Sequence, residues 1–327
     1  MISTLYAAAA RRRREWYAAR PEARRRLRRP VISVGNIAVG GRGKTPFAAA
    51  VARALLDVGE RPAVLSRGYG RAEPVDGVVV VRDVGGLRAD VARAGDEPFM
   101  LARQLDGAIV MSAPDRYASG RLAEHHFGAT VHVLDDGFQH FVLDRDADIV
   151  LVSAADLEAS TLPSGRLREP PDVLVAADAV VCVDDEVEFP TLDVPVFHAR
   201  RSLGAAVFET DGHAVDAAIP VFAFAGIAEP GRFFAGAASR YEVRRTRAFR
   251  DHHPYSAAEV AALTGEAKAC GAAALITTEK DYVRLLRHRP FAMPIGWLPL
   301  TITPEPEDDF RRWLAAAVAA ARDVVIA

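Results

Sequence analysis

A glycine-rich segment that ends in Lys-Thr constrains this chain more than any other feature of its sequence. The segment lies between Val31–Gly35, a run typical of a buried strand, and a run typical of a helix, which begins at Pro46 and ends at Leu56. In such a loop the glycines let backbone N–H groups face phosphate oxygens, the Lys reaches the outer phosphates, and the Thr hydroxyl coordinates Mg²⁺. The sequence therefore predicts an ATP phosphate-binding loop made of Gly40, Gly41, Arg42, Gly43, Lys44 and Thr45.

The lysine of this segment stands out against the composition of the chain. Lys and Arg total 41, and Lys occurs only at positions 44, 268 and 280, which leaves 38 Arg. Lys carries a compact point charge and Arg a wide planar fork, so the two are not interchangeable at a phosphate. Ala38 stands where the strict motif has Gly, and the alternative interpretation is a Gly-rich turn before a helix. The order of strand, loop and helix favours phosphate binding.

A second element of a nucleotide site follows further along the chain. The apolar run Val131–Leu134 ends in Asp135 and Asp136. P-loop sites use an apolar strand that ends in a carboxylate to reach Mg²⁺. Adjacent strand residues point to opposite sides, so one Asp is expected at the metal and the other at the loop or a water, and the sequence leaves open which. His132, inside this strand, is expected to be packed and hydrogen-bonded rather than a ligand.

Short β-branched runs alternate with helical stretches through the first two thirds of the chain, which is typical of a parallel sheet with crossover helices. At 327 residues the chain is long for one core. We therefore expect an α/β fold in which a P-loop NTPase-like, mostly parallel sheet flanked by helices occupies residues 31–205. Residues 1–30 are expected to form a basic helical segment, and residues 206–327 a second, smaller α/β domain that contributes to the active site.

Strands and helices of this fold are predicted from their apolar periodicity. Further strands are expected at Ala63–Leu65, Val78–Val81, Ile109–Met111, Ile149–Val152, Ala179–Val183, Val194–Phe197, Val221–Ala225 and Leu275–Thr278. Helices are expected at 2–17, Pro98–Gln104, Asp115–His125 and Phe310–Ala321, and a long loop at Leu162–Pro171.

Charge is distributed unevenly along the chain. Residues 1–30 hold ten Arg and two Glu, a local charge of +8, so the remainder carries −10 of the net −2. The mildly apolar start precedes Arg11–Arg14, the reverse of the order in a signal peptide. A helix here would gather Ile2, Leu5 and Tyr6 on one face, and two interpretations stay open: an interfacial helix on anionic lipid, or a solvated basic helix. Because the basic charge is confined to the N-terminal segment and the body is acidic, no nucleic-acid partner is expected.

Other composition features narrow the class of protein. No apolar run approaches the roughly 20 residues that span a bilayer. Cys182 and Cys270 lie far apart without CxxC spacing, which argues against a disulfide framework or a cysteine-rich zinc site.

Two short segments, one with carboxylates and one with histidines, are candidates for acid–base chemistry. Asp96 and Glu97 open a predicted helix, and the simpler interpretation is N-capping by Asp96 with dipole complementation by Glu97. The same position suits a base aimed at a hydroxyl near the phosphates. The segment 251–253 reads Asp-His-His and could orient a base or cap the following helix; for zinc it supplies too few ligands.

These motifs, taken together and in order, resemble the tetraacyldisaccharide 4′-kinases, the lipid A 4′-kinases of Gram-negative envelopes. The resemblance spans roughly residues 31–285. It rests on the segments 34–37 (VGNI), 40–46 (GGRGKTP), 66–70 (SRGYG), 95–98 (GDEP), 135–140 (DDGFQH), 162–163 (LP), 167–170 (LREP), 225–227 (AGI), 251–253 (DHH) and 278–281 (TEKD).

The resemblance implies transfer of the ATP γ-phosphate, with Mg²⁺, to the 4′-hydroxyl of a tetraacylated glucosamine disaccharide 1-phosphate. It also implies peripheral or monotopic association with the cytoplasmic face of the bacterial inner membrane. By the same resemblance Asp96 is the base, His252 its partner from the second domain, and Thr45, Glu97 and Asp136 the metal residues. Candidate lipid-phosphate contacts are Arg67, Arg116 and Arg168.

Two positions depart from the family pattern. Arg166 stands where the family commonly has Pro, and Ser153 replaces an acidic residue that usually follows the strand at 149–152. Arg166 lies within the long loop Leu162–Pro171 and Ser153 precedes it, so both departures bear on the expected contacts to the acceptor.

Two other functions fit part of the sequence. A P-loop GTPase or metallochaperone-type switch needs a guanine-reading [NT]-K-x-D, and Thr278–Asp281 has the wrong order, with Lys directly before Asp. A non-kinase membrane-binding ATPase would turn over ATP and leave the lipid unphosphorylated. In that case Asp96 and His252 would be only helix caps.

Overall fold

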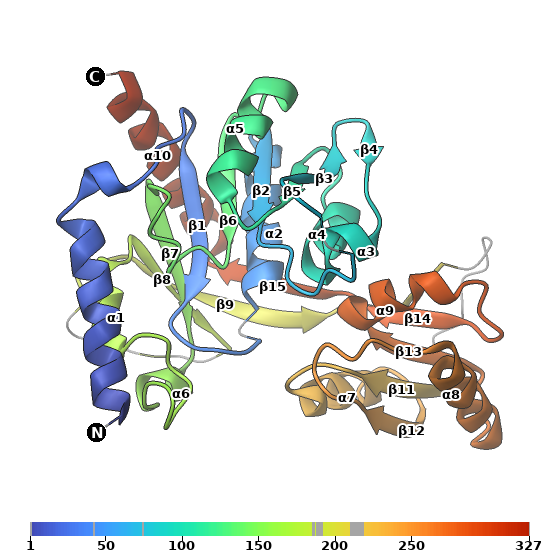
Figure 1. The fold of residues 1–327 in the computed structure, drawn as a ribbon. Coiled ribbons are helices and arrows are strands. Elements are labelled where there is room, and N and C mark those ends of the chain that lie inside the picture. Colours follow the sequence, from blue (N-terminus) through green and yellow to red (C-terminus); the bar gives the residue numbers. More distant parts are fainter. Residues whose placement is uncertain are drawn as a thin grey trace. The chain divides into compact units, whose positions relative to one another are not determined.

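The structure, a computed structural model, describes residues 2–41, 43–73, 75–184, 187, 192–209 and 219–326. For residues 324–326 it describes the backbone alone. The chain divides into two compact units, Met1–Arg201 with Ile302–Ala327 and Ser202–Thr301. Each unit has its own sheet (Figure 1). The division differs from the predicted second domain at 206–327, because residues from Ile302 onward belong to the first unit.

The first unit is built on a sheet of ten described strands in the order β15-β9-β8-β7-β1-β6-β2-β5-β3-β4. Strands β1, β2, β5, β6, β7, β8 and β9 pair in parallel, whereas β3 is antiparallel to β5 and β4 to β3. The strands are β1 Val31–Asn36, β2 Pro62–Ser66, β3 Val79–Asp83, β4 Gly86–Leu87, β5 Ile109–Ser112, β6 Val131–Asp135, β7 Ala147–Val152, β8 Ala179–Val183, β9 Val196–Leu203 and β15 Leu300–Glu305. This mostly parallel α/β sheet confirms the predicted fold class.

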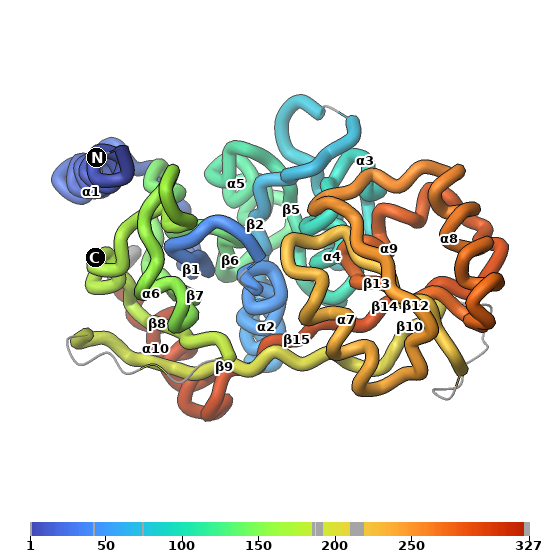
Figure 2. The backbone as a smooth tube through the Cα atoms, turned by 90° about the horizontal axis from the view of Figure 1, so that it is seen from below, coloured from blue at the N-terminus to red at the C-terminus, as the bar shows by residue number. Residues whose placement is uncertain are grey.

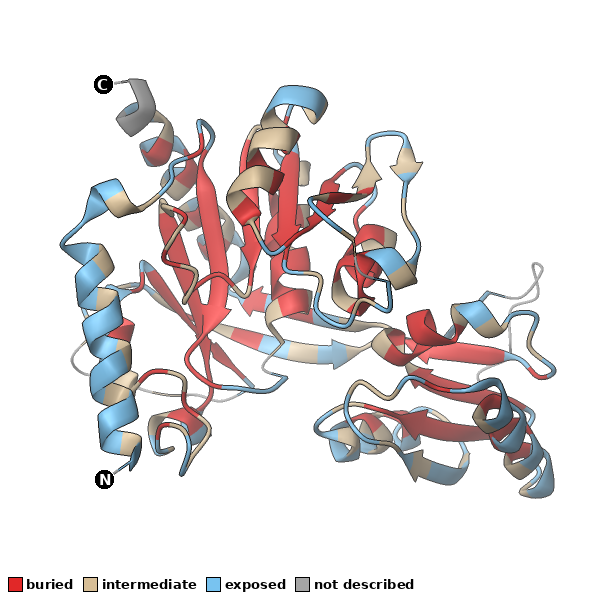
Figure 3. Cartoon of the chain, viewed as in Figure 1, coloured by how far each residue is buried: buried red, intermediate tan, exposed pale blue. Residues whose placement is uncertain are grey.

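Strand β1 lies in the middle of this sheet, between β6 and β7. Its six residues are all buried, as are the five of β6 and the six of β7 (Figure 3). Val34 is in register with Asp135 of β6, so the carboxyl ends of the two strands lie at the same edge. Ligands of open α/β sheets bind at this edge. The predicted phosphate loop and the predicted metal strand are therefore neighbours.

Helices cover the sheet because each buries one apolar face. Those of the first unit are α1 Ile2–Ala18, α2 Lys44–Asp57, α3 Val91–Ala94, α4 Asp96–Gln104, α5 Arg116–Phe127, α6 Ala154–Leu157 and α10 Glu307–Ile326. In α2 the residues Phe47, Ala48, Val51, Ala52 and Leu55 are buried. Among the described residues, no helix has the length and apolarity to cross a membrane.

The C-terminal helix α10 belongs to the first unit through an aromatic cluster. The ring of Phe310, 1% exposed, lies 5.5 Å from that of Phe47 in α2 and 5.3 Å from that of Phe197 in β9. Arg311 and Arg322 add ion pairs to Asp57 and Glu60. Packing of Phe310 against the helix that follows the phosphate loop explains why these residues join the first unit.

Helix α1 lies along one side of the first unit, beside α6 (Figures 1 and 2). None of its residues is fully buried. Tyr17 stacks on Phe141 at 5.6 Å, and the Ser3 hydroxyl is hydrogen-bonded to that of Ser164 at 2.7 Å. Ile2 and Leu5 are 68% and 67% exposed, so the predicted apolar face of this helix points away from the body.

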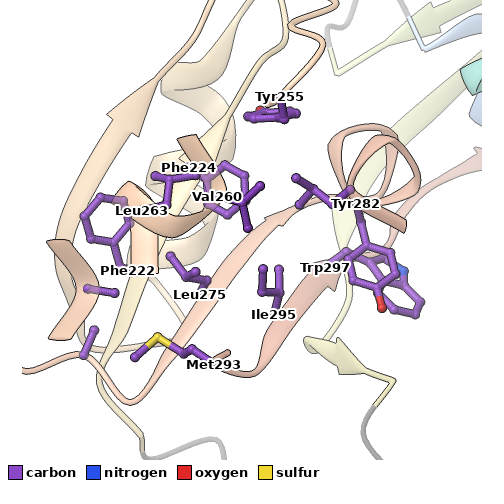
Figure 4. Packing of buried hydrophobic residues seen from close by; sticks show 13 residues of the cluster. Phe222, Phe224, Tyr255, Val260, Leu263, Leu275, Tyr282, Met293, Ile295 and Trp297 are labelled. Carbon is purple, nitrogen blue, oxygen red and sulfur yellow. The ribbon is translucent and has the colours of Figure 1, made fainter. Parts of the chain in front are cut away.

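The second unit is a smaller α/β structure with the strand order β10-β14-β13-β11-β12. Its strands are β10 Val207–Phe208, β11 Val221–Ala225, β12 Val243–Ala248, β13 Ala274–Thr278 and β14 Ile295–Leu298, and its helices are α7 Pro230–Ala238, α8 Ala257–Ala269 and α9 Glu279–Leu285. Phe222, Phe224, Leu275 and Trp297 belong to the core cluster under α8 and α9 (Figure 4). The rings of Tyr282 and Trp297 lie 4.4 Å apart.

Replacing Phe310 with Ala tests the assignment of α10 to the first unit. We expect Phe310→Ala to lower the free energy of unfolding by about 3–5 kcal/mol, because it leaves a cavity against Phe47 and Phe197. Urea denaturation measures the change. Arg312→Ala is the control, since this 79% exposed side chain pairs only with Asp309 among the described contacts, and we expect it to stay within about 0.5 kcal/mol of the parent. Equal stability of the two variants would contradict the packing.

Candidate functional site

The phosphate loop leaves β1, turns back and enters α2 as the motif predicts. Gly43 is the N-cap of α2 with φ 81°, in the left-handed region that favours glycine. A Cβ at this position would also lie 2.3 Å from the Ile302 side chain. Gly40 has φ 105°, and a Cβ at Gly40 or Gly41 would meet no atom within 4 Å, so this part of the loop faces open space. The predicted ligand Arg42 lies outside the described residues.

The side chain of Lys44 extends back across the start of α2. Its Nζ donates to Oδ1 of Asn36 at 3.2 Å and lies 3.6 Å from Oδ1 of Asp136. Burial lowers the pKa of this ammonium, and the Asp136 carboxylate opposes the shift. Lys44 is therefore a mostly buried cation held by one amide and one carboxylate, at the end of β1.

Asp135, the last residue of β6, is held by hydroxyl groups. The Thr45 Oγ1 donates to its two carboxylate oxygens at 3.3 and 3.2 Å, and Ser66 Oγ donates at 3.5 Å. Burial, together with the charges of Glu97 and Asp136, raises the pKa of Asp135 to about 7. The positive charge of Lys44 lowers the pKa of Asp135 but does not offset these effects.

Asp136 has different partners from its neighbour. It adopts φ 57° and accepts two hydrogen bonds from the Arg168 guanidinium, at 2.9 and 3.0 Å. Burial would raise its pKa, but Lys44 and Arg168 outweigh burial and hold it below the usual range. The two adjacent aspartates thus face opposite sides, as predicted, with Asp135 beside Thr45 and Asp136 beside the cations.

Asp96 and Glu97 begin helix α4. The N-cap of this helix is Gly95, without a side-chain cap bond, so the prediction that Asp96 would cap the helix is wrong. Asp96 is the first helical residue and is 6% exposed. The negative charge of Glu97 acts on both Asp135 and Lys44, which places Glu97 at the phosphate site. A Cβ at Gly95 would lie 2.7 Å from the Tyr69 carbonyl, so α4 begins against the loop that follows β2.

The predicted acceptor arginines differ in their surroundings. Arg116, at the start of α5, is 6% exposed, and burial lowers its pKa. Its NH1 contacts Nδ1 of His140 at 3.2 Å, and burial and the Arg116 charge lower the pKa of His140 to about 4. Arg67 is exposed, and its charge also acts on Arg116. Arg168 is engaged with Asp136, so it belongs to the phosphate site itself.

His252 lies in the second unit. Its ring nitrogens contact Lys280 Nζ at 3.1 Å and Arg284 NH2 at 3.2 Å, and its φ is 56°. The alternative that the Asp-His-His segment caps the next helix is wrong, because the N-cap of α8 is Ser256. His132 is confirmed as a packed histidine, fully buried and bonded to Glu124 at 3.2 Å.

Three further residues of the site were not assigned a role from the sequence. Asn36 is fully buried and receives the Lys44 ammonium. Gln139 donates to the Asn36 carbonyl at 2.9 Å and to Glu169 at 3.0 Å. Each belongs to one of the segments that carry the family resemblance, which was the available signal. Asn36 and Gln139 carry no charge and Glu169 lies far from Lys44 in the sequence, so nothing in the sequence alone connects them with Lys44.

Comparisons with known proteins agree with this geometry. A family model described as tetraacyldisaccharide-1-P 4′-kinase (LpxK) matches residues 1–319. A tetraacyldisaccharide 4′-kinase of Geobacter metallireducens is 41% identical over 296 residues, which cover 87% of this chain and 87% of that protein. One of Anaeromyxobacter dehalogenans is 41% identical over 276 residues, 78% of this chain and 72% of that protein.

A solved structure is similar over nearly the whole chain. It is the crystal structure of the "apo" form of LpxK from Aquifex aeolicus in complex with ATP, with a TM-score of 0.80, 31% identity and coverage of 97% of both chains. The phosphate loop, the carboxylate pair after β6 and these matches lead to one conclusion: the chain belongs to the tetraacyldisaccharide-1-P 4′-kinase family.

Proposed function

We propose that this chain transfers the γ-phosphate of ATP to the 4′-hydroxyl of a tetraacyldisaccharide 1-phosphate, in lipid A biosynthesis. The observation that carries the proposal is the junction of β1 and β6, where Lys44 is bonded to Asn36 and Thr45 to Asp135. A buried lysine and a hydroxyl–carboxylate pair at the end of neighbouring parallel strands are the parts that a P-loop site needs. The family and its ATP-bound structural neighbour support ATP as the donor.

The residues at this junction fit Mg·ATP. The Nδ2 of Asn36 is buried and has no hydrogen-bond partner among the described residues, and it lies beside the loop that would receive phosphates. Glu97 and Asp136 both repel Asp135, and a divalent cation would relieve this repulsion. Mg²⁺ in such sites bridges phosphate oxygens and neutralises charge that develops on them. Protein ligands for it are commonly one or two carboxylates and a hydroxyl.

The positions of the side chains suggest how the roles are divided. Thr45 and Asp135 are the hydroxyl and carboxylate that already lie together, and Glu97 acts on the same carboxylate, so these three would hold Mg²⁺. Asp136, which the family resemblance suggests as a metal residue, is bonded to Lys44 and Arg168. We therefore assign Asp136 to the orientation of these cations, which face the transferred phosphate.

Asp96 is the candidate base for the sugar hydroxyl. An attacking hydroxyl must lose its proton, and a positioned carboxylate accepts it. Asp96 is buried at the start of α4, next to Glu97, and its helix is capped by Gly95 instead. A cap is therefore not the reason for an Asp here. The role of His252 as the partner of this base stays a prediction from the resemblance, as do acceptor contacts by Arg67, Arg116 and Arg168.

We infer that α1 attaches the enzyme to the inner membrane at its cytoplasmic face. Ile2, Leu5, Ala9 and Trp16 share the exposed face of the helix, and Arg12 and Arg13 lie beside them. Ile2, Leu5 and Trp16 are 68%, 67% and 44% exposed. An exposed apolar ridge flanked by arginines is typical of helices that lie in the surface of an anionic bilayer. The lipid disaccharide would be met at that surface.

Transfer of label tests the function directly. With γ-labelled ATP, Mg²⁺ and tetraacyldisaccharide 1-phosphate in detergent, we expect label in the lipid. Lys44→Ala should reduce transfer by at least about a thousandfold, because an electrostatic contact to the transferred phosphoryl group is lost. Lys268→Ala, an exposed lysine of α8, is the matched control and should transfer normally. ATP hydrolysis without labelled lipid would instead favour a P-loop GTPase or metallochaperone-type switch, or a non-kinase membrane-binding ATPase.

A second prediction separates catalysis from helix capping. Asp96→Asn should lower kcat by about a hundredfold or more while the affinity for Mg·ATP stays near that of the parent, since general-base catalysis typically contributes this much. The control is Asp90→Asn, because Asp90 does cap a neighbouring helix and accepts from the Arg93 N–H at 3.0 Å. We expect it to affect the melting temperature and leave kcat unchanged. The assignment fails if Asp96→Asn behaves like Asp90→Asn.

A third prediction concerns the membrane. Leu5→Glu should weaken cosedimentation with vesicles that contain anionic phospholipid by about tenfold, because it places a charge on the apolar ridge. Thr4→Glu makes the same charge change at an exposed position of α1 off that ridge, and should weaken it less. Equal losses for both variants would show that only net charge matters. Retention of full binding by Leu5→Glu would remove α1 as the attachment site.

A further inference from the structure

We propose that helix α1 is part of the machinery that positions the phosphate site, with Arg14 as a positioning residue. Arg14 holds Glu169, Glu169 orients Gln139, Gln139 accepts a hydrogen bond from Arg168, and Arg168 holds Asp136 beside Lys44. This inference rests on the proposed function, because the site it acts on is the proposed ATP site. It concerns the body-facing side of α1, opposite the apolar ridge.

The contact between Arg14 and Glu169 is the first step. The guanidinium donates from Nε and NH2 to the two carboxylate oxygens at 2.9 and 2.7 Å. The two side chains are 16% and 3% exposed, and the guanidinium also lies over the Phe138 ring, 4.1 Å from its centroid. A two-point, largely buried contact of this kind fixes the direction of the carboxylate. α1 therefore sets the position of Glu169.

Gln139 carries the arrangement to the phosphate loop. Its Nε2 donates to Glu169 Oε2 at 3.0 Å and to the Asn36 carbonyl at 2.9 Å. Both acceptors require the NH2 group on that side, so the amide oxygen is turned the other way. That oxygen accepts from NH1 of Arg168 at 3.3 Å. The orientation of this amide, and with it one contact of Arg168, thus depends on Glu169.

Arg168 completes the connection. The same NH1 donates to both oxygens of Asp136, and Asp136 lies 3.6 Å from the Lys44 ammonium. The backbone contributes as well, because the Arg168 N–H donates to the Ile37 carbonyl at 2.6 Å, directly after β1. A continuous series of polar contacts within the first unit therefore joins α1 to the lysine of the phosphate loop.

A purely structural role for Arg14 makes a different prediction. If the pair only fastens α1 to the body, its loss lowers the melting temperature and leaves the folded site unchanged. If the pair positions the site, its loss also weakens binding of Mg·ATP by the folded protein. Arg11 offers a matched comparison on the same helix: it pairs with Asp172, but the two side chains are 52% and 60% exposed and contact none of the residues above.

The experiment measures the Kd of Mg·ATP for the full chain in detergent, without lipid, at a temperature where every variant is folded. We expect Arg14→Gln to raise this Kd about fivefold or more, a modest coupling between distant groups. Arg11→Gln removes the same charge and should change it by less than about twofold, as for an exposed pair. Arg14→Lys, which keeps the charge and loses the two-point contact, is the second variant if Arg14→Gln does not fold, and should also raise the Kd.

A double-mutant cycle adds a measurement that a merely structural role would not move. If Arg14 acts through Gln139, the double variant Arg14→Gln with Gln139→Ala should have a Kd close to that of the single variant that binds Mg·ATP less tightly. Multiplication of the two effects, or equal Kd values for Arg14→Gln and Arg11→Gln, would overturn the inference. Lipid phosphorylation by the parent would then still support the function. A parent that fails to bind Mg·ATP would refute both.

Discussion

The arrangement of the site depends on one buried cation, Lys44. An ammonium taken from water needs negative or polar partners, and the fold provides Asn36 from β1 and Asp136 after β6. Lys44 reaches both residues because β1 and β6 are parallel neighbours whose carboxyl ends lie at the same edge of the sheet. Asp136 in turn needs Arg168, which ties the loop after residue 160 to the sheet. The positions of Asp136 and Arg168 thus follow from the need to pair the buried Lys44. Binding of Mg·ATP would add a cation that relieves the repulsion among the carboxylates around Asp135.

The central strands of both sheets were predictable because they are buried on both faces and appear as continuous apolar runs. Ala179–Val183 and Val221–Ala225 have the predicted bounds. β12 was missed, since it is an edge strand with exposed arginines such as Arg244 and Arg245, a composition that protects edges and hides the strand signal. The return of the chain to the first unit has no local signal either. It follows from where Phe310 packs.

The charged residues that gather at the candidate site were more predictable than the residues that hold them in position. Charged residues next to a glycine or at the end of a strand, such as Lys44 and Asp135, can be recognised as site candidates from their position in the sequence. Gln139 and Glu169 do not, because their roles come from contacts between segments far apart in the chain, and a neutral amide has no charge pattern. The proposed assignment of Mg²⁺ to Asp135 rather than Asp136 also needed the fold. It rests on which of them faces Thr45 and which faces the cations.

The departures from the family pattern are explained by one side chain, Asp156. The Ser153 hydroxyl donates to it at 2.8 Å, and Arg166 forms an ion pair with it at 3.1 Å. Arg166 and Ser153 therefore act together and hold the loop before Arg168. Arginine holds carboxylates elsewhere in the chain as well. Arg14 donates two hydrogen bonds to Glu169, and Arg145 donates two to Asp148. A wide fork suits a carboxylate that must keep one direction. Lys44 shares its charge between an amide and a carboxylate, and in the proposed function it would also contact a phosphate. A compact ammonium suits that task better than a planar fork, which accounts for a lysine at this position in an otherwise Arg-rich chain.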